Sequence, residues 1–496
     1  MLVAVQIVQA SVMIVCFVIV IAIGLFANRW RGGGGKNLDE WALGGRSFGG
    51  VLTWFLQGGS IYTTYAYIAI PALVFGSGAI GLYSMPYLAM AFPVAYIFIP
   101  RLWQIARDQG FTTSSDYILY RFKSPTLAIV ITLTGIIAMV PYVSLQVYGI
   151  EICVAQVGLP VEVSLWSAFA LLAIVTYVSG LRSAVLIAVF KDVFLWATIL
   201  LAVVYIPRHL GGYAHVLHTI PASAFTVPHD QLANFASLAL GSAVVLFLWP
   251  HAITGALTAK SAAVVRRNCI YLPIYTMMLG ALALMGYMAR IAHLPVNKNY
   301  GANAAIPELF DKLFPSPIAG FGLAAMAIGA VVPAAVMSIS ASNLFAQNLW
   351  REYLRPAASP EQVTVVAKRS SLVVKFAAVG FILVSPHTYA LNFQLSGAVW
   401  MLQAAPSIFL ALVVPWLRRG PVFVGWLAGM AIGTLGLAAH GFSTASATYS
   451  LFGHSVVLYV GAPALLVNVA IAVLGSAVAH RRDGRGALLP HSLPAA

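Results

Sequence analysis

QGGSIYTTYAYIAIP, residues 57–71, places a glycine pair and a run of hydroxyl-bearing residues inside a long apolar stretch. Glycine weakens an α-helix, and in a bilayer no water binds the amide groups that a broken helix leaves free. Irregular backbone at membrane depth is tolerated only where it lines a cavity or is covered by protein. The stretch therefore predicts either a broken helix beside a binding site or a close helix–helix contact that small residues permit.

The composition around this stretch is that of an all-α polytopic membrane protein. Of the 496 residues, 61% are hydrophobic and 8% are charged, and the mean hydropathy is +0.90. Soluble domains carry about 25% charged residues. Apolar runs of about 20 residues, the length that crosses a bilayer as a helix, recur along the chain. The period-2 alternation of a membrane β-barrel is not seen.

Apolar length, bounded by charges, proline and glycine, predicts thirteen spans in a single transmembrane domain. We expect them at residues 3–27, 50–75, 80–100, 126–157, 162–181, 185–207, 234–257, 270–292, 317–349, 371–387, 394–416, 420–439 and 455–479.

The distribution of basic residues between the loops predicts the orientation of these spans in the membrane. With the N-terminus outside, the inward loops hold 22 Lys and Arg residues and the outward loops hold 4. Cytoplasmic loops are the ones enriched in Lys and Arg, so this asymmetry predicts an external N-terminus and a cytoplasmic C-terminus. It also accounts for the net charge of +14 without a nucleic-acid partner.

Several function classes find no support in the sequence. The glycine-rich RGGGGK at residues 31–36 lacks P-loop spacing, so a nucleotide-driven pump is not expected. An intramembrane enzyme would need paired acids or a His/Glu metal motif at membrane depth, and neither is present. A carrier or channel remains, with no organic cofactor. The alternative is a membrane solute sensor built on a carrier fold, although the tail after about residue 480 is too short for a signalling domain.

A second interrupted segment favours the carrier. VLFLWPHAITGALT, residues 245–258, places Pro250, His251 and Gly255 inside the seventh expected span. Spans 2 and 7 are five apart, so they begin two five-helix units that have opposite topology because five is odd. Paired interruptions at corresponding positions of inverted repeats are typical of a transporter's binding site. We therefore expect core repeats at about 50–207 and 234–416, with peripheral helices at 3–27, 420–439 and 455–479.

The chain resembles the sodium:solute symporter family, and within it the bacterial monocarboxylate permeases. The resemblance runs over nearly the whole chain and is carried by LDEWALGGRSFGG, IPALVFGSGAIGLY, IPRLWQIARDQGFTTSSDYILYRF, VPYVSLQVYGIE, YVSGLRSAVLIAVFKD, FLWPHAITGAL and AIGAVVPAAVMSISASNLFAQNLWREY. It implies a LeuT-type 5+5 inverted-repeat core in a bacterial inner membrane. The implied activity is ion-coupled import of a small monocarboxylate such as lactate, pyruvate or propionate, or of a small amino acid.

The resemblance also implies a Na⁺ site between the broken second span and the ninth span. The carbonyl donors would be those of Gly59 and Tyr62, and the ninth-span positions would be Gly329, Val332 and Pro333. None of these three has a side-chain oxygen, whereas Na⁺ requires oxygen ligands. Ser338 and Ser340 lie further along the same span. The coupling ion is therefore left open between Na⁺ and H⁺.

The substrate site is expected between the two interruptions and the fourth span. His251 is a candidate both for the substrate carboxylate and for a coupled proton, because histidine titrates near neutral pH; a neutral core histidine is the alternative. Tyr142 and Gln146 share a face of the fourth span. The expected substrate-binding residues are Gly59, Ser60, Tyr62, Thr63, Tyr142, Gln146, Trp249 and His251.

Three further charged groups lie in or beside spans. Lys191 and Asp192 are expected to form a gate or an interfacial ion pair at the inner start of the sixth span. Lys375 is expected about one turn from the inner end of its span, where a lysine reaches the interface by snorkelling. Glu151 is a second candidate for carrying protons, or else it bonds to a neighbouring span near the outer end.

Overall fold

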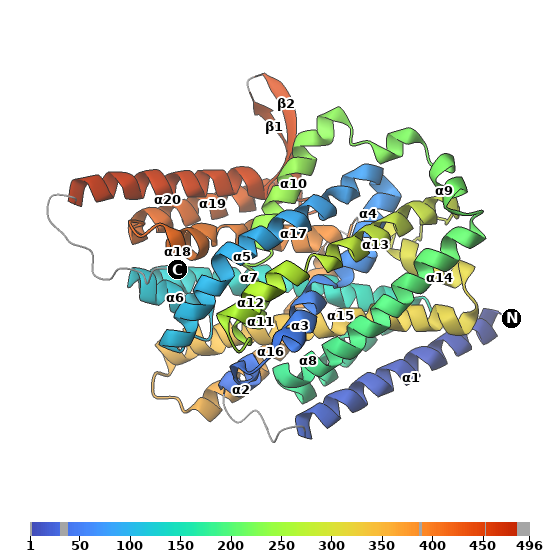
Figure 1. The fold of residues 1–496 in the computed structure, drawn as a ribbon, viewed down its shortest axis with the longest axis horizontal. Helices are drawn as coiled ribbons and strands as arrows, with labels where there is room; N and C mark the ends of the chain where they lie inside the picture. The colour runs from blue at the N-terminus through green and yellow to red at the C-terminus, as the bar shows by residue number, and fades with distance from the viewer. Residues whose placement is uncertain (1, 30–37, 386–388, 452, 484–496) are drawn as a thin grey trace.

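The computed structural model describes residues 2–29, 38–385, 389–451 and 453–483, and it is a bundle of long helices that lie side by side (Figure 1). Within these residues, eight helices are long and apolar enough to cross a membrane, or up to ten if each of two bent helix pairs is one span. The all-helical membrane architecture is confirmed. The count of thirteen spans and the sidedness of the termini stay predictions.

The first part of the chain, up to residue 219, contains nine α-helices among the described residues. They are α1 (Leu2–Arg29), α2 (Leu38–Leu43), α3 (Gly50–Ile61), α4 (Ile70–Ser77), α5 (Ser84–Gln109), α6 (Ser114–Phe122), α7 (Pro125–Ala155), α8 (Val161–His209) and α9 (Tyr213–Thr219). Helix α8 takes in both the fifth and the sixth expected spans. At 49 residues a straight helix would measure about 74 Å, more than twice the hydrocarbon thickness of about 30 Å. Within α8, Ala184–His209 is long and apolar enough to be a span of its own, and Val161–Ile174 is a shorter apolar stretch.

The second part adds the remaining helices and one hairpin. They are α10 (Leu232–Val245), α11 (Pro250–Leu257), α12 (Ala262–Tyr271), α13 (Ile274–Ile291), α14 (Ala305–Leu313), α15 (Ser316–Phe345), α16 (Pro360–Val384), α17 (Leu391–Leu402), α18 (Ala411–Val413), α19 (Arg419–Ala438), β1 (Ser446–Leu451), β2 (His454–Tyr459) and α20 (Gly461–Asp483). The two strands pair antiparallel, from Ser446 opposite Tyr459 to Leu451 opposite His454.

The second expected span is broken just after its glycine pair. Helix α3 ends at Ile61, and Tyr62 has φ −80° and ψ 82°, outside the helical region. A π-helical turn, Tyr65–Ala69, then leads into α4. Such turns are frequent at functional sites. The broken helix that the sequence predicts is confirmed, with the break at Tyr62–Thr64.

The seventh expected span is also broken, and its two halves are bent by 42°. Trp249 has ψ 133° and Pro250 is the first residue of α11. Proline disfavours helical backbone in the residue before it and suits the first position of a helix. The interruption therefore lies at Leu246–Trp249, ahead of Pro250. This interruption lies within the stretch 245–258 that the sequence marks as interrupted, and Pro250 begins the second half-helix.

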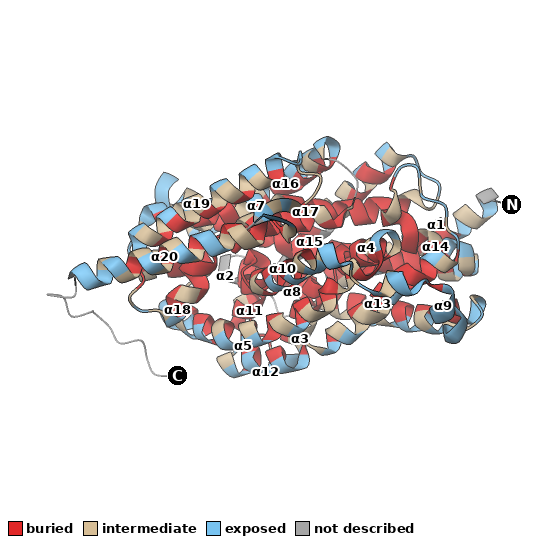
Figure 2. Ribbon diagram, turned by 90° about the horizontal axis from the view of Figure 1, so that it is seen from above, coloured by how far each residue is buried: buried red, intermediate tan, exposed pale blue. Residues whose placement is uncertain are grey.

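Helix α15 forms the centre of the bundle, and other helices face outward. The most apolar window of Ser316–Leu354 is wholly buried, whereas those of α1, α19 and α20 are 28%, 28% and 22% buried. Helix α15 packs against α1, α7 and α8. Figure 2 shows the same division, with buried residues along the middle of the molecule and exposed ones on α19 and α20.

Two boundaries near the C-terminus differ from the prediction. Helix α16 begins at Pro360, well before residue 371, and Ser359 and Gln362 close its first turn as a capping box. Residues 455–459, expected at the start of the last span, belong to strand β2 instead. The apolar SVVLYV was assigned to a helix because apolar length alone does not separate a strand from the start of a span.

Candidate functional site between the two helix breaks

A small cavity lies between the two broken helices. It is tight, with room for about one water molecule, and its lining comes from α3, from the second break and from α11: Gln57, Ser60, Ile61, Leu246, Phe247, His251, Ala252 and Gly255. Helices α3 and α11 pack directly against each other. Two of the expected substrate-binding residues, Ser60 and His251, are thus brought together from positions far apart in the sequence.

His251 is a polar group of this cavity with unused hydrogen-bonding capacity. The side chain is 1% exposed, and its Nδ1 has no hydrogen-bond partner among the described residues. The Tyr142 ring lies edge-on to it at 5.4 Å, and the Trp249 and Tyr142 ring centres are 4.8 Å apart. Buried polar atoms usually have a partner. An unpartnered imidazole nitrogen beside an aromatic wall suits a ligand that brings its own polar group.

Gln146 holds the first break from the side of α7. Its Oε1 accepts a hydrogen bond of 3.1 Å from the backbone amide of Thr64, and the Thr63 hydroxyl accepts one of 3.2 Å from the amide of Tyr65. The interruption removes the normal intrahelical partners of these amides, so the side chains replace them. Gln146 and Thr63 therefore stabilise the break, whereas neither lines the cavity.

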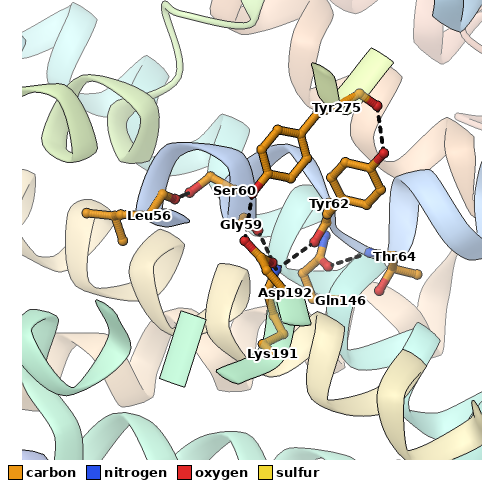
Figure 3. A network of polar contacts seen from close by, with 9 residues as sticks. All are labelled: Leu56, Gly59, Ser60, Tyr62, Thr64, Gln146, Lys191, Asp192 and Tyr275. Carbon is orange, nitrogen blue, oxygen red and sulfur yellow. Dashed lines mark hydrogen bonds and ion pairs between the residues drawn. The ribbon is translucent and has the colours of Figure 1, made fainter. Parts of the chain in front are cut away.

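The carbonyl groups of the same break bind a lysine. The Lys191 ammonium donates to the carbonyl oxygens of Gly59 at 2.8 Å and of Tyr62 at 3.0 Å, and it pairs with Asp192 Oδ1 at 3.0 Å. Figure 3 shows this contact, in which Lys191 reaches from α8 to the two carbonyls. The side chains of Lys191 and Asp192 are 0% and 1% exposed. The expected ion pair is confirmed, but its interfacial position was wrong because both groups are fully buried at the break.

Two tyrosines complete this network. Tyr275 on α13 donates its hydroxyl to Asp192 Oδ2 at 2.9 Å, and Tyr62 donates its hydroxyl to the Tyr275 carbonyl at 2.6 Å. A Cβ on Gly59 would lie 3.2 Å from the Lys191 Nζ, so glycine leaves room for the ammonium. The hydroxyl of Tyr62 points toward α13, whereas its carbonyl faces Lys191.

The residues expected to bind Na⁺ do not form an oxygen cage. Gly329, Val332 and Pro333 lie buried on α15, and a Cβ on Gly329 would meet the Tyr67 hydroxyl at 2.6 Å. Ser338 and Ser340 donate to carbonyls of their own helix, at 2.7 and 2.8 Å. The Gly59 and Tyr62 carbonyls already bind an ammonium, and two unit charges about 4 Å apart repel by about 4 kcal/mol at an effective dielectric constant of about 20. The residues at this position do not fit a Na⁺ ion.

Two other charged groups lie elsewhere in the bundle. Lys375 is 0% exposed, and its ammonium donates to the Ser371 carbonyl of its own helix at 3.0 Å. The snorkelling interpretation was therefore wrong, because α16 begins at Pro360 and places Lys375 about four turns inside the helix. Glu151 accepts a hydrogen bond of 3.1 Å from the Tyr300 hydroxyl, and so it bonds to a neighbouring segment.

Sequence reasoning missed the role of Lys191, although a signal was present. An ionisable residue six positions into an expected span is costly and marks function by default. What the sequence does not show is the partner, since Lys191 lies 132 positions from Gly59.

A membrane helix bundle with two breaks that meet at one cavity is the architecture of a secondary transporter. The sodium:solute symporter family model matches residues 41–433. A monocarboxylate transport permease of Rhizobium johnstonii is 40% identical over 94% of this chain and 96% of its own length. The uncharacterized symporter YodF of Bacillus subtilis is 33% identical over 83% of this chain and 84% of its own length.

A solved structure shares the fold. The outward-open state of a Na⁺-coupled sialic acid symporter superposes with a TM-score of 0.75 at 18% identity, covering 95% of this chain and 98% of that one. This similarity confirms the LeuT-like architecture. The chain belongs to the sodium:solute symporter family. Its fold and family are those of transporters and not of enzymes.

Proposed function

We propose that this chain imports small monocarboxylates, with lactate, pyruvate and propionate as candidate solutes and small amino acids as the neighbouring class. A Na⁺ or H⁺ gradient drives the uptake. The chain lies in a bacterial inner membrane with its N-terminus outside and its C-terminus in the cytoplasm. The two breaks lie in corresponding helices, each the first helix of its repeat, and the repeats cover about residues 50–207 and 234–416.

The observation that carries the proposal is the cavity between the two breaks. It brings the hydroxyl-bearing Ser60 and the unpartnered Nδ1 of His251 to one enclosed space. The N-terminus of α11 begins at Pro250 beside it, and a helix N-terminus carries partial positive charge that attracts an anion. The cavity has room for about one water molecule, so it must widen to admit one small carboxylate, whose short apolar part would then lie against Phe247 and Ile61.

The relatives support the solute class. The Rhizobium johnstonii protein that shares 40% identity is a monocarboxylate transport permease. A sodium/proline symporter of Escherichia coli is more distant, at 26% identity over 84% of this chain and 84% of its own length. Proline and lactate both present one carboxylate on a small carbon skeleton, and this is the shared chemistry that the cavity would recognise.

Uptake into proteoliposomes tests the proposal. Radiolabelled lactate, pyruvate, propionate, alanine and proline are offered with an inward Na⁺ gradient and an inward H⁺ gradient imposed separately. We expect at least one monocarboxylate to accumulate above its external concentration when one of the two gradients is imposed. It should not accumulate when neither gradient is present. A sensor would bind without accumulation. Failure of lactate, pyruvate and propionate to accumulate, with proline accumulating instead, would contradict the solute class.

A further inference from the structure

We propose that Lys191 is a tethered cation, whose ammonium permanently fills the position between the Gly59 and Tyr62 carbonyls that the family resemblance assigns to Na⁺. The chain would then require no Na⁺ from solution at this position. The inference concerns the break and not the solute, so it can fail while the proposed function stands, and the reverse also holds.

The geometry of the ammonium carries this inference. Its nitrogen lies 2.8 Å from the Gly59 oxygen and 3.0 Å from the Tyr62 oxygen, the two carbonyls that the break turns away from helix pairing. At membrane depth such carbonyls need a partner, because no water reaches them. A bound cation would satisfy them, and the ammonium, which offers three donors, does so without leaving the chain.

Charge balance points the same way. Asp192 Oδ1 lies 3.0 Å from the ammonium, and Asp192 Oδ2 accepts from the Tyr275 hydroxyl at 2.9 Å. The cluster therefore contains one positive and one negative group, both buried and both bonded. A Na⁺ ion added here would leave a buried positive charge without a counter-ion, which a low-dielectric interior disfavours.

The ninth-span positions agree with a filled site. Gly329, Val332 and Pro333 provide no side-chain oxygen, and Ser338 and Ser340 donate into their own helix. The break carbonyls and the Asp192 carboxylate, which a free Na⁺ would use as ligands, are all bound to Lys191. The side-chain ammonium of Lys191 takes the place of the Na⁺ ion, and it requires no ligands from the ninth span.

The test measures the thermal unfolding midpoint of the purified chain in NaCl and in choline chloride at equal ionic strength, without solute. We expect wild type to unfold at the same temperature in both salts. Lys191→Met vacates the position and leaves two carbonyls with the Asp192 carboxylate, so Na⁺ should raise its midpoint by about 2 °C or more relative to choline. Lys191→Met/Asp192→Asn removes both charges and should be insensitive to Na⁺.

Lys375→Met is the matched control, since it also removes a buried lysine but leaves only the Ser371 carbonyl behind. It should not acquire a Na⁺ response. If Lys191→Met folds only when purified in Na⁺, the proposal is supported, because Na⁺ then takes the place of the ammonium. A Lys191→Met protein that fails to fold in both salts, or whose Na⁺ response equals that of wild type, would overturn it.

Discussion

The side-chain oxygen of Gln146, midway along α7, accepts a hydrogen bond of 3.1 Å from the backbone amide of Thr64 in the first break. The two residues lie 82 positions apart. At the same break, Lys191 binds the carbonyls of Gly59 and Tyr62. Gln146 thus bonds to the freed amide and Lys191 bonds to the freed carbonyls. The break is therefore stabilised by specific side chains of the neighbouring helices.

Gln146→Leu should weaken both folding and transport. It leaves the amide of Thr64 buried without its partner, which costs about 1–3 kcal/mol. We expect a lower unfolding temperature and at least a tenfold loss of uptake rate, because the break is no longer held. Gln403→Leu is the control, since Gln403 is equally buried but lies at the bend between α17 and α18, where it bonds to Val399 and Asn468 and not to the two breaks at the cavity. Equal loss of uptake in both variants would show that Gln146 has no special link to the site.

Gly58→Ala should displace the aromatic partner of Asp192. A Cβ at this position would lie 2.1 Å from the Tyr275 ring, so the ring must shift. Overpacking of this kind costs about 1–3 kcal/mol, and the shift would break the hydrogen bond from Tyr275 to Asp192. Gly50→Ala, at the first residue of α3 with no atom within 4 Å of the new Cβ, is the control and should leave uptake unchanged. Unfolding temperature and initial uptake rate are measured for both.

Asp192→Asn should destabilise the chain more than the double variant Lys191→Met/Asp192→Asn. The single change leaves a buried ammonium without its counter-ion, and breaking a buried pair costs about 3–5 kcal/mol. Removing both charges restores neutrality, so part of that loss should be recovered. The measurement is a double-mutant cycle on unfolding in detergent. Strictly additive effects would mean that the two charges do not interact as their 3.0 Å separation indicates.

His251→Ala should impair solute binding. It removes the unpartnered nitrogen that faces the cavity, and the loss of one hydrogen bond to a charged group, about 1.5 kcal/mol, corresponds to roughly a tenfold rise in KM. His218→Ala, at an exposed position of helix α9, should leave KM unchanged. The concentration dependence of uptake distinguishes the two. An unaltered KM in His251→Ala would assign His251 to packing.

The features of the fold that the sequence predicts are those with local causes. A glycine pair followed by hydroxyl-bearing residues predicts the break at Tyr62–Thr64, and Pro250 determines where α11 begins. The capping box at Ser359 and Gln362 is an equally local signal. It was overlooked because the first turns of α16 are polar, and apolar length was the criterion for a span.

The candidate site could be predicted less completely, because its contacts join distant parts of the chain. Ser60 and His251 were expected near each other from the pairing of the two interruptions, and the cavity brings them together. The partner of the Gly59 and Tyr62 carbonyls was not expected, since no local pattern links α8 to this break. The direction of the Tyr62 hydroxyl likewise depends on Tyr275, which lies 213 positions away.

The most direct test of the central claim, that solute binds between the two breaks, is substrate protection of a cysteine placed in the cavity. Ser60→Cys is treated with a small thiol reagent, with and without the transported monocarboxylate, and residual uptake is measured. Cys16, Cys153 and Cys269 are buried, so wild type serves as the background. Ser77→Cys, at an exposed position outside the cavity lining, serves as the accessible control. We predict that the reagent inactivates Ser60→Cys, that solute slows this inactivation severalfold, and that modified Ser77→Cys keeps its uptake. Inactivation of Ser60→Cys at the same rate with and without solute would contradict the account.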